Sequence, residues 1–391
     1  MNLSHAQTAM RQEGIDCWLV YDFQNTNPIA AQLLPERRFV SRRIYLLVPA
    51  EGEPVILGSK IDNDALLALP YRAEFYVSWQ EMQRKLADLL APYQTLGLDY
   101  SPECALPVAS RVDAGTFEFV RGLGKSIKSA ANVFQAAAAQ WSAGALAQHL
   151  ADCQTVAGIK DEAFAFIETR LRAGDAVTEY DVQQFIMQRF EASNLFTPYP
   201  PIVGVNGHSG DPHYSPTAGR HAAITPGDWI LIDLWAKKPG GEHIFADMTW
   251  VGFAGATPSA KQVEVFETVR SARDAAVQFL QAAAQRGETA QGWQVDDPAR
   301  QVIEQAGYGE YFFHRTGHSL GPGDHVHGQG ANIDNLETHD TRRLQPGIGF
   351  SIEPGIYLPE FGVRLEINVY MDESGPRVTT PLQQDIILME V

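Results

Sequence analysis

Short apolar runs alternate with helix-like spacings along the first 130 residues. The runs predict strands, and apolar residues three and four positions apart predict helices between them. Besides a short N-terminal helix, we expect strands at 15–21, 43–49, 54–58, 74–79 and 95–100, and helices at 81–90 and 107–123. The turn AEGE joins the second and third strands as a hairpin. This pattern predicts an independent α/β domain.

Helical spacing dominates from residue 130 to about residue 196. Within this stretch, Thr178 followed by Asp181 predicts a capping box at the start of a helix. The change from alternating strands and helices to continuous helix suggests a domain boundary. We place it between residues 130 and 131, so that the predicted domains are 1–130 and 131–391.

Beyond residue 196, short strands separated by glycine and proline predict an antiparallel-rich α+β domain. Two helices interrupt the strands. One is expected at 259–284, and the other begins after Asp297 with Pro298 as its first helical residue.

The segment 363–370 alternates strictly between apolar and polar residues. Its apolar residues are Val363, Leu365, Ile367 and Val369, and its polar residues are Arg364, Glu366, Asn368 and Tyr370. Such alternation predicts a strand with one face on the core and the other in water. Considered alone, Glu366 is therefore expected on a solvated face.

The composition narrows the class of protein. The chain has 391 residues, of which 45% are hydrophobic, and a net charge of −17, which argues against nucleic acid or an anionic membrane as a partner. We see no run long enough for a membrane span and no signal-peptide pattern. The three cysteines, Cys17, Cys104 and Cys153, form no CxxC motif, which favours a reduced, cytoplasmic protein.

Five ionisable residues lie in segments where such side chains are unusual. They are Asp233 in DWILIDLW, Asp247 in HIFADMTWVGF, His318 in HRTGHSLG, Glu353 in GFSIEPGIY and Glu366 in GVRLEINVYM. Each alone also suits a structural role, but a carboxylate in an apolar strand is costly to bury unless it is paired or binds a metal. Together they could hold two divalent ions, Mn²⁺ first, with Co²⁺ or Zn²⁺ as alternatives. Such a pair of ions supports amide hydrolysis.

The ordered segments resemble the metallopeptidase family of methionine aminopeptidase, aminopeptidase P and prolidase, which has the pita-bread fold. The segments are DPHY, LIDLW, ADMTW, HRTGHSLG, FSIEPGIY and FGVRLE. The resemblance covers about residues 150–391, and the preceding part is similar in pattern to a creatinase-like N-terminal domain. It implies an α/β creatinase-like domain followed by an α+β pita-bread catalytic domain.

The resemblance also implies roles for the five ionisable residues. Asp233 would bind one metal ion and His318 the other. Asp247 and Glu366 would bridge both ions. Glu353 would be a ligand beside the bridging water, and it would act as the general acid and base.

Four further positions of the family pattern are matched, with two candidate residues for the last of them. His213, in DPHY, would contact the substrate amide. His314 matches a histidine of the aminopeptidase P pattern, and Arg364 matches an arginine that braces the ligand carboxylates. A last histidine, seven positions after the ligand histidine, falls on His325 by count, or on His327 if GPGDHVH contains a two-residue insertion. We favour His327 and keep His325 as the alternative.

The chain departs from the family pattern in the segment around the two aspartates. They are separated by 14 positions, three more than is usual, and AKKPGGEHIF carries the extra length, which predicts a longer turn. Trp235 stands where a glycine is usual, and Trp250 where an arginine is frequent. No metal ligand is lost, so the departures concern substrate preference and tuning of the metal site.

The resemblance implies a peptidase that cleaves between an N-terminal residue and proline, with a small peptide substrate and a homodimeric assembly. The two-domain length favours Xaa-Pro dipeptidase (prolidase), with aminopeptidase P, which acts on longer peptides, as the alternative. A dipeptidase must bind a free carboxylate, and the arginines available for this in the N-terminal domain are Arg37, Arg38, Arg42 and Arg43, of which we name Arg38 and Arg42 as substrate-binding candidates.

Two further hypotheses involve no metal chemistry. A creatinase-like enzyme or a binding module of the same fold would be expected to lose metal ligands. All five ligand positions are retained here, which disfavours both.

Overall fold

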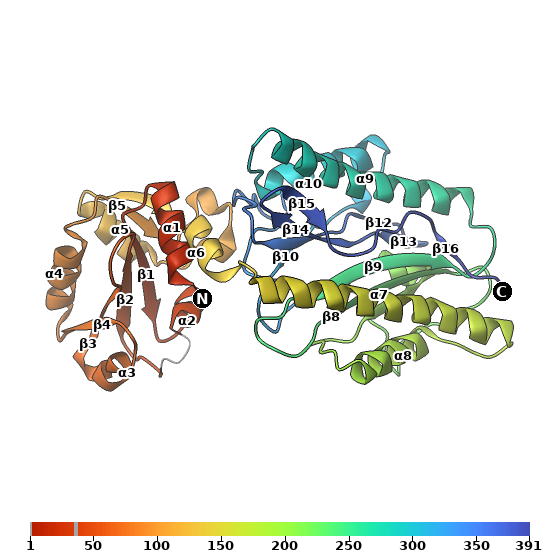
Figure 1. The fold of residues 1–391 in the computed structure, drawn as a ribbon, viewed down its shortest axis with the longest axis horizontal. Coiled ribbons are helices and arrows are strands. Elements are labelled where there is room, and N and C mark those ends of the chain that lie inside the picture. The colour runs from red at the N-terminus through yellow and green to blue at the C-terminus, as the bar shows by residue number, and fades with distance from the viewer. Residues whose placement is uncertain (1, 35–37) are drawn as a thin grey trace. The chain divides into compact units, whose positions relative to one another are not determined.

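The computed structural model describes residues 2–34 and 38–391. The chain forms two compact units, Met1–Ala138 and Ala139–Val391 (Figure 1).

The N-terminal unit is built on a six-stranded sheet with the order β4-β3-β2-β1-β5-β6. Strands β1, β2 and β3 pair antiparallel, and the remaining neighbours pair parallel. The strands are β1 (Cys17–Phe23), β2 (Arg43–Pro49), β3 (Val55–Ser59), β4 (Arg72–Tyr76), β5 (Thr95–Leu98) and β6 (Ser126–Ser129). The predicted hairpin of β2 and β3 is confirmed.

Helices cover both faces of this sheet. Residues of α1, α2 and α6 share one core with the sheet, and residues of α4 and α5 share a second. The helices are α1 (Leu3–Glu13), α2 (Pro28–Leu33), α3 (Asn63–Leu67), α4 (Trp79–Leu90), α5 (Ala114–Gly122) and α6 (Ala131–Ala138). Because Val133 and Phe134 of α6 are buried in the first core, the division of the chain comes at the end of α6, after the boundary expected from the sequence.

Most predicted elements in this unit are shifted by about two residues at one end or both, and two boundaries have a clear local cause. The strand expected to reach residue 79 ends at Tyr76, because Ser78 caps a helix that already begins at Trp79. The helix expected at 107–123 begins only at Ala114, where the Asp113 side chain accepts a hydrogen bond from a backbone N–H of the first turn.

The C-terminal unit contains two four-stranded sheets, β16-β9-β8-β7 and β10-β11-β14-β15, and the pair β12-β13. All neighbours pair antiparallel except β16 and β9. The strands are β7 (Ile202–Val205), β8 (Trp229–Ala236), β9 (Ala246–Phe253), β10 (Ser319–Leu320), β11 (Gly349–Ile352), β12 (Gly355–Tyr357), β13 (Gly362–Arg364), β14 (Ile367–Asp372), β15 (Gly375–Val378) and β16 (Ile387–Leu388). The predicted antiparallel-rich α+β domain is confirmed.

Four long helices enclose these strands, as Figure 1 shows. They are α7 (Ala143–Arg172), α8 (Glu179–Ala192), α9 (Ala260–Gln285) and α10 (Gly292–Gln305). Alternate residues of β8 enter different cores: Ile230, Ile232 and Leu234 pack with α7 and α8, whereas Trp229 and Leu231 pack with α9 and α10. The strand is thus buried on both faces, and the Asp233 side chain lies on the same face as Trp229 and Leu231.

The helix starts in this unit test the capping predictions. Thr178 and Asp181 form the expected capping box at α8, and Ser259 caps α9. The predicted start of the next helix at Pro298 is wrong. Helix α10 begins at Gly292, with Gln291 and Gln294 as its capping box, and Pro298 lies inside it. In the described part of the chain, no helix is long and apolar enough to cross a membrane.

Replacing Thr178 by Ala should lower the free energy of unfolding by about 1 kcal/mol, because the first turn of α8 loses its side-chain acceptor. Denaturant unfolding measures the change. Thr155→Ala is the control, since Thr155 lies inside α7 and its hydroxyl only bonds back to Ala151. Equal losses in both variants would contradict the capping role.

Candidate metal centre

The hairpin of β8 and β9 places both aspartates on one face. Asp233 lies directly opposite Thr249, and Asp247 lies opposite Trp235. Residues opposite each other in an antiparallel pair share a face, as do residues two apart in one strand. Period two therefore puts Asp233 and Asp247 side by side on the face that does not contact α7 and α8.

The polar residues of 363–370 meet this face residue by residue. The Nη2 of Arg364 donates to Asp233 Oδ2 at 2.5 Å, and the Oε2 of Glu366 accepts from the Thr249 hydroxyl at 2.8 Å. The Oδ1 of Asn368 accepts from the Asp247 backbone N–H at 2.9 Å. The expectation of a solvated face is thus wrong for these three residues. The sheet that contains β8 and β9 covers this face, and all three residues are buried.

His318 and Glu353 come from two neighbouring segments. The Ser351 N–H donates to the carbonyl of His318 at 2.8 Å, and the Glu353 N–H donates to the carbonyl of Thr316 at 2.7 Å. The segments are so close at Gly317 that a Cβ there would lie 2.0 Å from the Ser351 carbonyl oxygen. The glycine in HRTGHSLG therefore permits the approach that brings the two side chains together.

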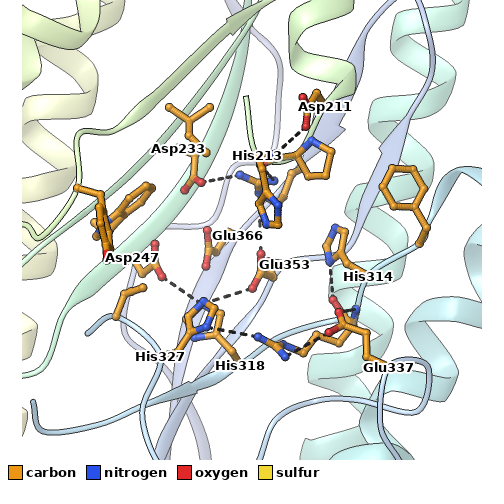
Figure 2. A pocket seen from close by; sticks show the side chains of 18 of the residues that line it. Asp211, His213, Asp233, Asp247, His314, His318, His327, Glu337, Glu353 and Glu366 are labelled. Carbon is orange, nitrogen blue, oxygen red and sulfur yellow. Dashed lines mark hydrogen bonds and ion pairs between the residues drawn. The ribbon is translucent and has the colours of Figure 1, made fainter. Parts of the chain in front are cut away.

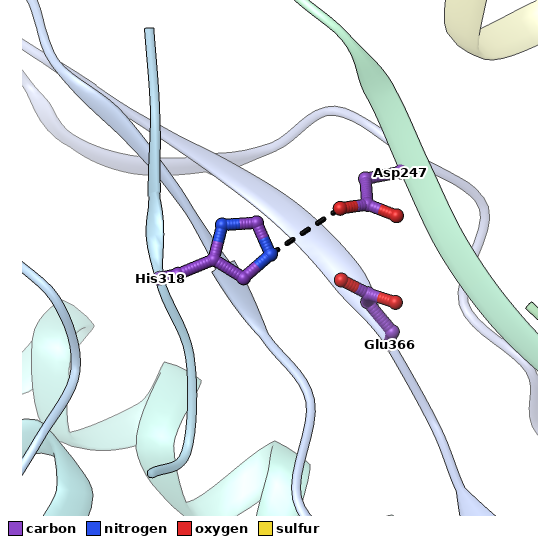
Figure 3. A group of neighbouring side chains, drawn as sticks. All are labelled: Asp247, His318 and Glu366. Atoms are coloured by element: carbon purple, nitrogen blue, oxygen red, sulfur yellow. Dashed lines mark ion pairs between the residues drawn. The ribbon is translucent and has the colours of Figure 1, made fainter. Parts of the chain in front are cut away.

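The five predicted ligands all line one pocket of about 1230 Å³. Figure 2 shows their side chains converging from β8, β9, the segment before β10, the end of β11 and the break between β13 and β14. The His318 Nε2 lies 3.3 Å from Asp247 Oδ2 and 3.5 Å from Glu353 Oε1. Ligand atoms of Asp247, His318 and Glu366 all lie within 4.8 Å of one another (Figure 3).

The electrostatics of this cluster call for a cation. Burial raises the pKa of Asp233 and Asp247, and it raises that of Glu366 well above the ordinary range, with a further contribution from the neighbouring carboxylates. The Oε1 of Glu366 is buried and has no hydrogen-bond donor. Arg364 supplies one positive charge to four carboxylates, so divalent ions fit the charge that remains.

The tautomer of His318 also fits a metal ligand. Its Nδ1 lies 3.1 Å from the Ser319 carbonyl oxygen, which can only accept a hydrogen bond, so we assign the proton to Nδ1. The other ring nitrogen, Nε2, faces Asp247 and Glu353, which raise the pKa of His318 against the effect of burial, and a bound metal ion would take the place of the Nε2 proton. A second hydrogen bond of this kind orients many metal-binding histidines.

The other predicted residues of the C-terminal unit line the same pocket: His213, His314, His325, His327 and Arg364. The ring of His327 contacts that of His318, with 4.0 Å between the ring centroids. His213 is exposed to the pocket, and its backbone N–H donates to Asp211. Both His325 and His327 therefore reach the pocket, but His327 is the one in contact with a predicted ligand.

A buried hydrogen-bond chain links His314 to Arg364. The Tyr357 hydroxyl lies 2.7 Å from His314 Nε2 and accepts from Arg364 Nη1 at 3.0 Å. Burial lowers the pKa of His314 to about 3, with Arg364 adding to the effect, so its imidazole is neutral. Sequence reasoning missed Tyr357, although it stands in the quoted segment FSIEPGIY.

The N-terminal candidates belong to the other unit. Arg38 and Arg42 are exposed there, and their role as carboxylate ligands stays a prediction. Arg37 lies outside the described residues.

Sequence reasoning also missed Arg315 and Glu337, which line the pocket. Glu337 accepts from the Arg315 backbone N–H at 2.9 Å, and its other oxygen lies 3.4 Å from Arg315 Nη1. Arg315 Nη2 lies 3.4 Å from His327 Nδ1. The position of Arg315 between two predicted histidines in HRTGHSLG could have suggested it, whereas no pattern marks Glu337.

Comparison with known proteins gives the family. Residues 151–373 match metallopeptidase family M24. The chain belongs to this family. The Xaa-Pro dipeptidase of Lactobacillus helveticus is 35% identical over 191 residues, or 49% of this chain and 47% of the relative. That of Pyrococcus furiosus is 33% identical over 187 residues, or 48% of each chain. The chain thus aligns with about half the length of these M24 relatives.

Solved structures support the two-unit pita-bread architecture. The dipeptidase PepE of Mycobacterium ulcerans superposes with a TM-score of 0.63 and 23% identity, covering 100% of this chain and 97% of that one. The X-prolyl aminopeptidase of Caenorhabditis elegans, described as having a di-nuclear active site, has a TM-score of 0.63 and 16% identity, covering 99% and 63%. The predicted fold class is confirmed.

Metal binding should depend on pH. Because the pKa values of Asp233, Asp247 and Glu366 are raised, the metal-free protein loses stability as the pH rises through these values and the buried carboxylates ionise. Divalent ions bind the ionised form and restore this stability. The increase in Tm on adding Mn²⁺ should therefore be larger at pH 8 than at pH 5.5, reaching about 5 °C at saturating metal. Thermal unfolding of chelator-treated protein tests this.

Glu366→Gln should reduce the Mn²⁺ effect, because one ligand oxygen becomes an amide. For the unmodified protein, an increase in Tm that is the same at pH 5.5 and pH 8, or no increase at either pH, would contradict the metal centre.

Proposed function

We propose that the protein is a dinuclear metal-dependent peptidase that cleaves between an N-terminal residue and proline, as an Xaa-Pro dipeptidase. The observation that carries this proposal is the cluster of four carboxylates and one imidazole that lines the pocket, all of them buried except the partly exposed Glu353. Relatives named Xaa-Pro dipeptidase support the substrate class.

Two divalent ions would be held by the five predicted ligands, and we propose Mn²⁺, with Co²⁺ or Zn²⁺ as alternatives. When bound, such a pair lowers the pKa of water and stabilises negative charge on the carbonyl oxygen of the substrate. The ligand set, carboxylate oxygens with one nitrogen, supports this assignment.

Glu353 is the proposed general base and acid. Its carboxylate is partly exposed to the pocket, and the Ser351 hydroxyl donates to Oε1 at 3.1 Å. Glu353 would take a proton from the attacking water and return it to the departing proline nitrogen. This transfer is needed because the proline nitrogen must gain a proton as the amide bond breaks.

The histidines would orient the peptide. His213 would contact the substrate amide, and His327 would donate to the carbonyl oxygen as negative charge develops on it. We assign this role to His327 rather than His325 because His327 contacts His318. Arg364 would keep Asp233 in position directly, and the neutral His314 would support Arg364 through the Tyr357 hydroxyl.

The free carboxylate of a dipeptide also needs a partner. Arg315 supports this requirement, because its guanidinium lies beside His327 and its ion pair with the half-exposed Glu337 is long, at 3.4 Å. In an Xaa-Pro dipeptide the carboxylate lies one residue beyond the scissile carbonyl, or about 3.8 Å between Cα positions. Arg315 is thus a third candidate, besides Arg38 and Arg42.

Aminopeptidase P activity on longer peptides is the second candidate. The pocket of about 1230 Å³ exceeds the roughly 300–1,000 Å³ of usual small-molecule sites, so it has room for more than a dipeptide. His314 also matches the aminopeptidase P pattern.

Assembly and location are further proposals. We propose a homodimer, on the family resemblance, which light scattering of the purified protein would test. We propose a cytoplasmic location, supported by three cysteines that are free, although Cys104 is exposed.

With Mn²⁺ present, the protein should cleave Ala-Pro faster than Ala-Pro-Ala, and it should leave Met-Ala-Ser and creatine unchanged. Faster cleavage of Ala-Pro-Ala would favour aminopeptidase P, and no Xaa-Pro cleavage would refute the proposal.

Glu353→Gln should lower kcat about 100-fold or more, because the proton acceptor is lost. A variant with full activity would contradict only that role.

Arg315→Gln should raise KM for Ala-Pro about 10-fold or more, because a charge-assisted pair with the substrate carboxylate is lost. Ala-Pro amide, which lacks this carboxylate, is the matched substrate and should show little change. Arg38→Gln and Arg42→Gln in parallel identify the alternative partners. An equal effect of Arg315→Gln on acid and amide would contradict carboxylate binding.

A further inference from the structure

The long turn between β8 and β9 begins with a buried lysine. Lys237 is 0% exposed, although ammonium groups are rarely buried without partners. Its position, between the strands that carry Asp233 and Asp247, places it in the segment that is longer than the family pattern.

All three protons of this ammonium have backbone acceptors. The Lys237 Nζ donates to the carbonyls of Gly240 at 3.1 Å and His243 at 3.2 Å, which belong to the same turn. The third acceptor is the carbonyl of Gly323, at 2.5 Å, far along the chain. Asp324 adds a negative charge 3.5 Å away. A lysine has three donors and no acceptor, so these contacts use its full capacity.

Gly323 and Asp324 belong to the loop 321–328, which carries both pocket histidines, His325 and His327. This loop holds the insertion that the sequence suggests in GPGDHVH. Lys237 thus joins the turn that exceeds the family spacing to the loop in which the His327 assignment places an insertion.

A small apolar core also includes residues of both segments. Val326, between the two histidines, packs against this core, which contains Ile244 of the long turn together with Trp141 and Leu320. The turn and the loop therefore share a buried charge at one end and an apolar core next to His327.

We propose that Lys237 is a positioning residue that holds His327 against the metal-ligand cluster. The turn and the aspartates are parts of one hairpin, so a loop tied to the turn keeps a constant place relative to Asp233 and Asp247. The longer turn and the longer loop compensate each other through this lysine. The inference rests on the proposed function only for its kinetic consequence. The contact between Lys237 and the loop 321–328, called the lysine tie below, does not depend on the reaction.

Lys237→Met removes the charge and keeps most of the side-chain volume. Backbone amides of 321–328 should then exchange hydrogen about 10-fold faster or more, while amides of β8 and β9 change little. Lys238→Met is the matched control, because the neighbouring Lys238 donates to the carbonyl of Ser193 instead. Unchanged exchange in the loop, or equal effects of both variants, would overturn the proposal.

A second variant tests the tie from the loop side if Lys237→Met folds poorly. Gly323 has a φ of +132°, and a Cβ there would meet no atom within 4 Å. Gly323→Ala should therefore disturb the carbonyl through the backbone alone and raise loop exchange in the same way. Exchange like that of the unmodified protein would contradict the tie.

The kinetic test uses a double-mutant cycle with Ala-Pro as substrate. Lys237→Met should lower kcat about 10-fold in the unmodified protein but less than 2-fold in a His327→Ala background, because the lysine acts through that histidine. In a His325→Ala background the full effect should remain. Equal effects in all backgrounds would indicate a structural role alone and overturn the positioning role.

The two measurements separate the two hypotheses. If the unmodified protein cleaves no Xaa-Pro peptide, the proposed function fails, while the exchange data still decide whether Lys237 holds the loop.

Discussion

The C-terminal unit depends on the burial of several like charges at one point. Four carboxylates and an imidazole converge where two sheets meet, and Arg364 supplies one compensating charge. Burial raises the pKa values of Asp233, Asp247 and Glu366, and the neighbouring carboxylates add to the effect. Such a cluster is costly in a metal-free fold and favourable once divalent ions are bound, which makes metal binding and folding of this region linked processes.

The two sheets supply this cluster through simple alternation. Each residue of β8 points either to the core under α7 and α8 or to the opposite side, so Ile232 and Asp233 have entirely different surroundings. The polar side chains of 363–370 add the remaining contacts to this layer, since Glu366 and Asn368 accept hydrogen bonds from β9. The polar side chains of the candidate metal centre thus lie in one layer between apolar cores.

The convergence of the five candidate ligands on one pocket could be predicted because burying charge in an apolar strand has few physical solutions. Asp233 in DWILIDLW and Asp247 in the next strand carry that signal locally, and the ordered motifs add the family. Glu366 was expected to be solvated when considered alone, since alternation shows two faces but not what covers the second one. The start of α10 was misplaced for a similar reason, because Pro298 is a frequent first residue of helices but is tolerated here within one.

By itself, the sequence determined the type of each domain, most strands, the cap at Thr178, and the five ionisable residues that we propose as metal ligands. These depend on periodicity and on chemistry within a few positions. Only the tertiary structure decided which histidine of GPGDHVH contacts His318, that Arg315 and Tyr357 belong to the pocket, and that Lys237 joins two distant segments. Those contacts link residues far apart in the chain, and no local pattern encodes which of them meet.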